Sequence, residues 1–439
     1  MRVALIKPAV SGTRPNIEKA VYMIGGTLPV LAAYTPDGFD LSVYDESLTP
    51  IDFSKQFDLV GITVMTPAVP RAYQLADYYR SLGTKVVLGG AHVTSLPQEA
   101  KQHADAVSLF NGEKTWPAIL HDVRSGKLNK IYQSDFSTQS TASDLENRKF
   151  PRRDILRPTD FSKLKVLVES VATSVGCIYT CNFCMIPIMY GKKHIANPTE
   201  SVIDDIRLVP GDRIYLNDDN FMGNPKAAEQ LFRAMIELQK EKKFEWYSQS
   251  TIVLGKKPEL ARLARESGCR AIYIGFESVN DMSVRYDVGK GCNHVREYAA
   301  AIKTLQDNGI RVEGGFVFGF EHDDRTIFEK TLEFVDKVAL DSVNPHILTP
   351  HPGTQVYKDL MTQERIFAHG DWGNFYTGKV VFTPHSMSAE QLQDGYDWFC
   401  EEAFSLRRII GRSFHGYQIG GVKQSLETLV MNVVGKPVI

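Results

Sequence analysis

The sequence lacks the patterns that mark membrane, secreted and nucleic-acid-binding proteins. No apolar run approaches the roughly 20 residues that a helix needs to cross a bilayer. The N-terminal segment MRVALIKPAV leads into a strand and lacks the long apolar core and small-residue cleavage site of a signal peptide. Lysine and arginine form no basic stripe, and the formal net charge is -2. We therefore expect a cytoplasmic protein with no membrane span and no nucleic-acid partner.

Cysteine is also scarce, with six residues in a chain of 439. Three of them, Cys269, Cys292 and Cys400, are scattered without an even framework of spacings. Small secreted domains held by disulfides show a dense and regular cysteine pattern instead. The distribution therefore argues against a disulfide framework and indicates a reducing compartment.

The other three cysteines share one short loop, in the segment VGCIYTCNFCMIP. Cys177, Cys181 and Cys184 have the spacing C-x3-C-x2-C, so three thiolates can close around a cluster of iron and sulfide. Closed metal sites normally use four protein ligands, and no fourth thiol lies nearby in the sequence, so one metal position would stay open. Residues 166–175 before the loop predict a buried strand, and strand ends are where chemistry is expected in an α/β fold. Taken alone, the loop also fits three buried or zinc-binding cysteines that fall close together.

Residues 1–135 alternate between strand and helix patterns, which predicts a Rossmann-like, doubly wound parallel sheet. The clearest helix is VPRAYQLADYYRSLG, whose apolar residues recur at helical spacing and which ends at Gly83. The predicted strands are residues 3–8, 41–47, 59–66, 86–90 and 106–113.

Ligands of such sheets bind beyond the carboxyl ends of the strands. Polar residues and glycines gather at those ends here, and glycine lets the backbone approach a ligand closely. A domain of this fold that binds nothing is the alternative, because a fold alone does not establish a ligand. The candidate binding residues are Asp45, Thr63, Thr66, Gly89, Gly90, His92, Gly112 and Glu113.

Three further segments follow. Residues 136–162 have the polar composition of a linker. Residues 163–360 contain six successive strand-helix units, which favour a partial (β/α)6 barrel of the TIM type over an open sheet, with the cysteine loop after its first strand. Residues 361–439 are rich in aromatic residues and predict a small, mainly helical extension, with one helix beginning at an N-cap on Ser388.

The cysteine loop, with Phe183 just before its third cysteine, resembles the motif of the radical S-adenosylmethionine (SAM) superfamily. Members bind a [4Fe-4S] cluster through the three cysteines and hold SAM on the remaining iron. The resemblance therefore implies that Cys177, Cys181 and Cys184 bind a cluster. It also implies reductive cleavage of SAM to a 5′-deoxyadenosyl radical, which abstracts hydrogen from an unactivated carbon.

Strand ends of the second domain match the SAM-binding segments of this superfamily in order. The resemblance assigns the amino group of SAM to the segment LNDDN and the ribose hydroxyls to Glu277 in IGFES. Lys290 and His351, on loops near the same face, are candidate proton donors or substrate contacts, with surface or packing roles left open. Because side chains alternate along a strand, one of Ser248 and Gln249 is expected to point inward. The residues implied for SAM are Phe183, Asp218, Asp219, Asn220, Ser248, Gln249, Glu277, Gly314, Gly315 and Thr349.

The segment from VGITVMTPAVPRAY to NGEKTW looks like the cobalamin-binding domain that precedes the barrel in one branch of the superfamily. The sequence lacks the D-x-H-x-x-G motif that supplies a histidine to cobalt, which implies a cobalt without a protein imidazole. His92 is then a candidate cobalamin contact or a loop histidine in water. The segment VVFTPHSMSAEQLQDGYDWFCEEAFSLRRI looks like the C-terminal extension of this branch, which implies that residues 361–439 close the barrel and line the substrate cavity. Trp372, Phe375 and Tyr376 either stack on a substrate there or belong to the core.

Together these resemblances imply a cobalamin-dependent radical SAM C-methyltransferase that acts on a small molecule, pigment or lipid. The electron would come from a donor such as flavodoxin or ferredoxin. An enzyme of the same architecture that cyclises, rearranges or oxidises its substrate, possibly without cobalamin, is the second hypothesis. The third, from another class, is a sensor of cobalamin or SAM, and it is disfavoured because binding alone needs no open iron.

Overall fold

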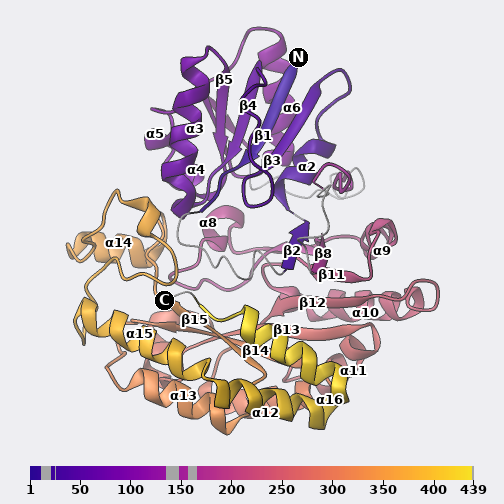
Figure 1. Cartoon of the computed structure of the whole chain (residues 1–439), viewed down its shortest axis with the longest axis vertical. Coiled ribbons are helices and arrows are strands. Elements are labelled where there is room, and N and C mark those ends of the chain that lie inside the picture. Colours follow the sequence, from indigo (N-terminus) through magenta and orange to yellow (C-terminus); the bar gives the residue numbers. More distant parts are fainter. Residues whose placement is uncertain (11–20, 25, 135–147, 157–165, 438–439) are drawn as a thin grey trace.

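The computed structural model describes residues 1–10, 21–24, 26–134, 148–156 and 166–437. Two parallel sheets with covering helices form the two halves of the molecule (Figure 1). This arrangement confirms the predicted α/β class. The expected linker, residues 136–162, and the start of the next domain lie largely outside the described residues.

The N-terminal sheet is six-stranded and parallel throughout, in the order β3-β1-β4-β5-β6-β7. Strand β1 lies in the interior and the order changes direction there, as in a doubly wound fold. Strands in this sheet have continuous buried runs, such as Val3 to Ile6, because helices cover both faces. The strands are β1 (Arg2–Lys7), β3 (Asp40–Asp45), β4 (Leu59–Thr63), β5 (Lys85–Gly89), β6 (Ala106–Leu109) and β7 (Ile131–Gln133). The helices are α2 (Thr27–Ala33), η1 (Thr66–Ala68), α3 (Val69–Ser81), α4 (Ala91–Ser95), α5 (Pro97–Ala100) and α6 (Gly112–Arg124).

The second sheet contains the six predicted barrel strands in sequence order, joined side by side and parallel. Helices alternate with these strands, as a partial (β/α)6 barrel requires. The strands are β8 (Val166–Val171), β11 (Arg213–Leu216), β12 (Glu245–Ser250), β13 (Cys269–Glu277), β14 (Arg311–Phe318) and β15 (Ser342–Ile347). The helices between them are α9 (Thr199–Leu208), α10 (Pro225–Leu238), α11 (Pro258–Glu266), α12 (Val295–Asp307) and α13 (Ile327–Lys337).

A seventh strand of the barrel sheet comes from the N-terminal part of the chain. Strand β2 (Val21–Ile24) lies between β1 and α2 in the sequence, yet it pairs in parallel with β8 at the edge of the barrel. The sequence predicts no strand here, because four residues give too short a pattern to indicate one. The two domains are therefore joined by backbone pairing as well as by the chain that links them.

A small hairpin frames the cysteine loop. Strand β9 (Ser174–Gly176) pairs antiparallel with β10 (His194–Ala196), and α8 (Ile186–Tyr190) lies in between. Gly176 has φ 80°, and a Cβ there would lie 2.2 Å from the carbonyl oxygen of Lys193. Only glycine fits this position, which fixes where the loop leaves the hairpin.

The C-terminal segment contacts both halves. Trp372, Phe375 and Val381 belong to a core cluster that also contains residues of the N-terminal sheet and of α3. Trp372 and Phe375 are therefore core residues, which was one of the two roles expected for them. The remaining helices are α14 (Gln355–Thr362), α15 (Ala389–Ala403) and α16 (Leu406–Val434). Among the residues that the structure describes, no helix combines the length and the hydropathy needed to cross a membrane.

Candidate functional site

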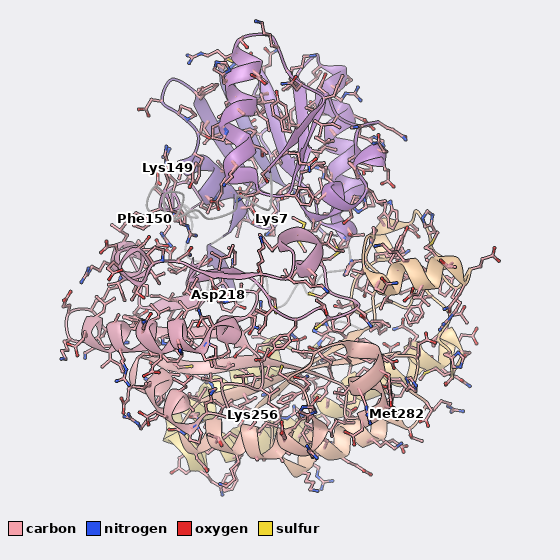
Figure 2. The ribbon with its side chains drawn as sticks, turned by 180° about the vertical axis from the view of Figure 1, so that it is seen from behind. Lys7, Lys149, Phe150, Asp218, Lys256 and Met282 are labelled. Atoms are coloured by element: carbon pink, nitrogen blue, oxygen red, sulfur yellow. The ribbon has the colours of Figure 1, made fainter. Side chains whose placement is uncertain are left out.

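The carboxyl ends of the two sheets face each other, with α8 between them (Figure 1). Figure 2 labels one residue on each of these edges, Lys7 at the end of β1 and Asp218 just after β11. Carboxylates from both halves of the molecule act on Tyr190 of α8. Burial, and after it the carboxylates of Asp219 and Glu113, raises the pKa of Tyr190 to about 12. Asp219 belongs to the barrel and Glu113 to the N-terminal sheet, so residues predicted for two different ligands approach the same tyrosine.

The three cysteines of the loop are free thiols of intermediate exposure. Two N–H groups point at their sulfur atoms. Asn220 Nδ2 donates to Cys177 Sγ at 3.4 Å, and the backbone N–H of Ile186 donates to Cys184 Sγ at 3.4 Å. Burial raises the pKa of Cys181, and it raises the pKa of Cys184 to about 11. A thiol in such surroundings is not ionised near neutral pH by itself, so a bound cation is what would favour the thiolate.

The carboxylate of Asp218 holds the hairpin before the cysteine loop. It accepts hydrogen bonds from the backbone N–H and the hydroxyl of both Thr173 and Ser174. Burial raises the pKa of Asp218 to about 6, although these hydrogen bonds act to lower it. Its side chain is occupied by the protein, so Asp218 supports the loop, and its predicted contact with SAM could come only from its backbone.

Its neighbours are bonded less completely by the protein. Asp219 is half-buried and accepts from the backbone N–H of Gly176 at 2.8 Å through one carboxylate oxygen. Asn220 is buried, and its Oδ1 has no hydrogen-bond partner in the described part of the chain. On the neighbouring strand β12, Gln249 is the predicted residue that reaches Asp218, because its Nε2 donates to the carbonyl of Asp218 at 2.7 Å. The Ser248 hydroxyl donates instead to the carbonyl of Leu216.

Glu277 ends β13 in a strained backbone conformation, with φ 69°. Its Oε1 accepts from Lys290 Nζ at 2.8 Å, and the same Nζ donates to the carbonyl of Gly275 at 2.7 Å. Burial acts to lower the pKa of Lys290, but the carboxylate of Glu277, followed by Cys181, raises it above its ordinary value. Lys290 therefore stays charged and holds Glu277 in place, which makes it a poor proton donor. Asn293, which is not among the residues predicted from the sequence, stabilises the end of β13. Its Nδ2 donates to the carbonyls of residues 275 and 276.

Close packing explains the glycine pair of β14. A Cβ on Gly315 would lie 2.0 Å from the hydroxyl oxygen of Tyr273, and one on Gly314 would lie 2.5 Å from Leu340 Cδ2. These glycines make room for protein side chains, so a contact with adenine would involve their backbone. Thr349 is buried, and its hydroxyl donates to the carbonyl of Ile347 at 3.1 Å.

His92 lies at the boundary between the N-terminal domain and the C-terminal segment. Its side chain is fully buried, with Nε2 3.3 Å from Glu99 Oε1, and its ring packs edge-to-face against Trp372. Glu99 also accepts from the Trp372 indole at 3.0 Å and from the Tyr73 hydroxyl at 2.9 Å. His92 is thus not a loop histidine in water. Its Nδ1 has no hydrogen-bond partner among the described residues, which leaves that atom for the predicted ligand contact.

His351 is close enough to His92 for their charges to interact. Burial, and after it His92, lowers the pKa of His351 to about 4. Near neutral pH its imidazole is neutral, so it can accept a proton or a hydrogen bond but is not a ready acid. The role of proton donor considered for His351 is therefore disfavoured, while that of a substrate contact remains.

The other candidates of the N-terminal sheet lie where their strands end. Asp45 accepts from Lys7 Nζ at 3.0 Å and from Ser47, so it stabilises its own loop. Gly90 has φ 103°, and a Cβ there would lie 2.8 Å from both the backbone nitrogen and oxygen of Val64. Thr63 and Gly89 end β4 and β5, Thr66 begins η1, and Gly112 and Glu113 begin α6 after the cap Asn111.

Polar side chains inside the barrel are absent from the residues predicted from the sequence. They occupy alternate positions of the strands, the positions that point inward, and burial raises the pKa of Tyr215 to about 12. Strand periodicity is the signal that could have identified them. These residues are Tyr215, Tyr247, Tyr273, Glu313, Asn344 and His346.

Comparison with known proteins defines the class. Residues 171–335 match the radical SAM superfamily, and residues 20–120 match the B12-binding domain. The chain is a radical SAM protein with an N-terminal B12-binding domain, a class that uses an iron-sulfur cluster, SAM and cobalamin.

Two relatives with assigned reactions are similar over most of their length. Bacteriochlorophyllide d C-12(1)-methyltransferase of Chlorobaculum tepidum is 28% identical over 417 residues, 93% of this chain and 88% of the relative. Hopanoid C-2 methylase of Rhodopseudomonas palustris is 26% identical over 392 residues, 86% of this chain and 71% of the relative. The cobalamin-dependent S-adenosylmethionine radical enzyme OxsB, solved with aqua-cobalamin and SAM, shares the fold with a TM-score of 0.71 at 15% identity, over 97% of this chain and 70% of that chain.

The residues present fit these three groups. No set of three metal-binding side chains in the described part of the chain converges on a single ion. A cubane cluster spreads its cysteine ligands over separate irons, so the loop does not need such convergence. At the strand ends where SAM is predicted, Asn220 Oδ1 is a buried polar atom without a hydrogen-bond partner among the described residues, and Glu277 is the last residue of β13. At the edge predicted for cobalamin, Gly90 lets the turn after β5 pass against the backbone of Val64, and His92 Nδ1 is a buried polar atom without a hydrogen-bond partner among the described residues.

Proposed function

We propose that this protein is a cobalamin-dependent radical SAM C-methyltransferase. The observation that carries the proposal is that the two strand edges meet. Gly353, in the loop after β15 of the barrel, lies so close to α8 and to α4 of the N-terminal domain that a Cβ there would be 3.2 Å from both Ile188 Cδ1 and Ser95 Oγ. A methyl carrier on one edge and a radical source on the other would then reach one substrate from two sides. When bound, the cluster with SAM supplies the organic radical, and cobalamin supplies the methyl group.

The chain's own residues bind, orient and exclude water. The loop Cys177–Cys184 would hold the cluster, and Glu277, kept in place by Lys290, would orient SAM. Asp219 and Asn220 would bind the charged end of SAM. The neutral imidazole of His351 and the tyrosines inside the barrel would contact the substrate.

We infer a polycyclic, largely apolar substrate. Both curated relatives described above carry names of enzymes that methylate such molecules, a bacteriochlorophyllide and a hopanoid. The tyrosines on the inward face of the barrel strands offer flat contact surfaces for a ring system. A one-electron donor of the flavodoxin or ferredoxin type would complete the system.

The test uses protein purified anaerobically with cobalamin and assayed with a one-electron donor such as reduced flavodoxin, a bacteriochlorophyllide or a hopanoid as methyl acceptor, and SAM that carries a labelled methyl group. Each turnover should release one 5′-deoxyadenosine and one S-adenosylhomocysteine and place the label on carbon. Cys181→Ala should abolish both products, whereas Cys269→Ala, at a buried cysteine outside the loop, should leave them in place. Formation of 5′-deoxyadenosine without S-adenosylhomocysteine would contradict methylation and favour cyclisation or oxidation. Protein that binds no iron would overturn the proposal entirely.

A further inference from the structure

The last helix, α16, is a hairpin of two antiparallel halves. Its backbone leaves helical geometry at Gly420 and Gly421, where φ is -139° and 70°. The halves are held together by a buried polar contact, in which Arg412 Nη1 donates to Asn432 Oδ1 at 2.9 Å. Figure 1 shows α16 in gold and yellow beside α15, in the half of the molecule that holds the barrel sheet.

The hairpin buries polar residues and exposes apolar ones, the reverse of an ordinary surface helix. Its buried positions are almost all polar or glycine, whereas nine large apolar side chains are between 37% and 78% exposed. Apart from the adjacent Leu429 and Val430, the exposed positions of each half recur every three or four residues, so they form one stripe along each half. The buried residues are Ile409, Arg412, Gly416, Gln424, Thr428 and Asn432. The exposed apolar residues are Leu406, Ile410, Phe414, Tyr417, Val422, Leu426, Leu429, Val430 and Val433, and they are called the outer face below.

The second half of the hairpin is fixed to the amino ends of the barrel strands. Lys423 pairs with Glu245, the first residue of β12. Glu427 pairs at 2.6 Å with Arg311, the first residue of β14. Asn432 Nδ2 donates to the carbonyl of the residue that precedes β15. The hairpin therefore covers the end of the barrel opposite to the cysteine loop, so the outer face is separate from the candidate active site.

The exposed charges of the hairpin are few and positive. Residues 405–439 contain five lysines and arginines but only one acidic residue, whereas the whole chain carries a formal charge of -2. The single acid, Glu427, is neutralised by its pair with Arg311. Arg408 pairs with Asp336 and Glu402, Lys423 pairs with Glu245, and Arg412 is buried, which leaves Arg407 and Lys436 as the exposed cations in the described part of the hairpin, beside the apolar stripes. An apolar stripe flanked by cations is the composition of helices that lie on anionic membranes.

We propose that the outer face of α16 binds the surface of a lipid bilayer with anionic headgroups, with both halves of the hairpin lying in the plane of the interface. The apolar stripes would enter the acyl boundary while Arg407 and Lys436 contact lipid phosphates. A second copy of the chain is a poorer occupant, because a twofold pair would bring two faces of the same positive sign together. The inference is independent of the proposed reaction, since it concerns the opposite end of the barrel.

The test is flotation of the full-length protein with its cofactors on vesicles of phosphatidylcholine alone or with a minority of phosphatidylglycerol. The wild-type protein should float with the anionic vesicles, and flotation should weaken at high salt. The triple variant Ile410→Ser, Phe414→Ser, Leu426→Ser should reduce the bound fraction at least about tenfold. The charge variant Arg407→Glu, Lys436→Glu should bind anionic vesicles no better than neutral ones.

A matched control tests whether any loss of exposed apolar surface has this effect. Leu82, Leu208 and Met282 lie outside α16 and are 60%, 57% and 49% exposed. Their combined replacement by serine should leave flotation unchanged. Wild-type protein that does not float, or a triple variant that floats as well, would overturn the proposal. Self-association of the wild type that the triple variant abolishes, measured by sedimentation velocity, would reassign the outer face to a second copy.

Discussion

His351 and His92 interact at the boundary between the N-terminal sheet and the segment after β15. Burial, and then the neighbouring charge, lowers the pKa of His351 to about 4, and burial also lowers the pKa of His92. An unfolded chain would protonate both near pH 6.5, so it binds more protons than the folded chain below that pH. The stability associated with these histidines is therefore complete above about pH 6.5 and is lost as the pH falls toward 4.

His351→Gln should remove part of this pH dependence, because glutamine is of similar size and does not titrate. We expect the wild type to lose about 1 kcal/mol more than the variant between about pH 7.5 and pH 5.5. Thermal unfolding midpoints of both proteins at the two pH values measure the difference. Parallel shifts in the two proteins would contradict a neutral, half-buried imidazole. His121→Gln, at a histidine whose side chain is 82% exposed, is the matched control and should follow the wild type.

The ion pair of Lys290 and Glu277 is buried on both sides, with side chains 9% and 10% exposed. Lys290→Met should destabilise the protein by about 3–5 kcal/mol, since it leaves a buried carboxylate without its cation. Adding Glu277→Gln should recover part of this loss while it weakens SAM binding. Denaturant unfolding and equilibrium dialysis of SAM measure the two effects.

The exposed pair of Lys303 and Asp307, on consecutive turns of α12, provides the control. Lys303→Met should change stability by no more than about 0.5 kcal/mol. If Lys290→Met with Glu277→Gln were as unstable as Lys290→Met alone, the unpaired carboxylate of Glu277 would not be the reason for the loss of stability.

At the scale of elements, the turn after β5 positions the backbone at the carboxyl edge of the N-terminal sheet. Gly83 and Gly90 both have positive φ, at 80° and 103°, but a Cβ meets nothing within 4 Å at Gly83 and meets the backbone of Val64 at Gly90. Gly83→Ala should therefore cost about 1 kcal/mol, and Gly90→Ala about 2–4 kcal/mol, since the second adds a steric clash. Urea unfolding measures both. Cobalt content after purification with cobalamin should fall only for Gly90→Ala, and equal effects of the two substitutions would contradict the argument.

Other elements show how far local pattern extends. The periodicity of residues 258–266 predicts the amphipathic helix α11, and its buried positions are the apolar ones. The same reasoning fails for α16, whose apolar positions face outward because its contacts with the barrel are ion pairs and amides. It fails for β2 as well, since strand pairing depends on which sheet edge is free.

At the scale of the molecule, the C-terminal segment ties the two domains together. Trp372 is 4% exposed, packs in the core of the N-terminal domain, and donates its indole N–H to Glu99. Trp372→Ala should therefore destabilise this boundary by about 3–5 kcal/mol. Hydrogen exchange should speed up in α3 to α5 but not in β11 to β14.

Trp398 is the matched control, because it is 38% exposed on α15. Trp398→Ala should leave exchange in α3 to α5 unchanged. Equal exchange in the two variants would show that the C-terminal segment does not hold the N-terminal domain. Among the described residues after 361, those in the core of the N-terminal domain all precede α15, so a cavity-lining role is proposed for that part and not for α16.

The sequence by itself determined the α/β class, the order of the strands and helices other than β2 and β7, and the cysteine loop. These depend on local periodicity and on the spacing of three thiols, which the chain carries regardless of its neighbours. The tertiary structure alone decided which polar groups are free. Asp218 is saturated by the hairpin, Lys290 is held by Glu277, and His351 is neutral, because burial and hydrogen bonding depend on residues far away in the sequence. It also decided that β2 joins the barrel and that α16 presents its apolar side to solvent, since both depend on the partners that the folded chain supplies.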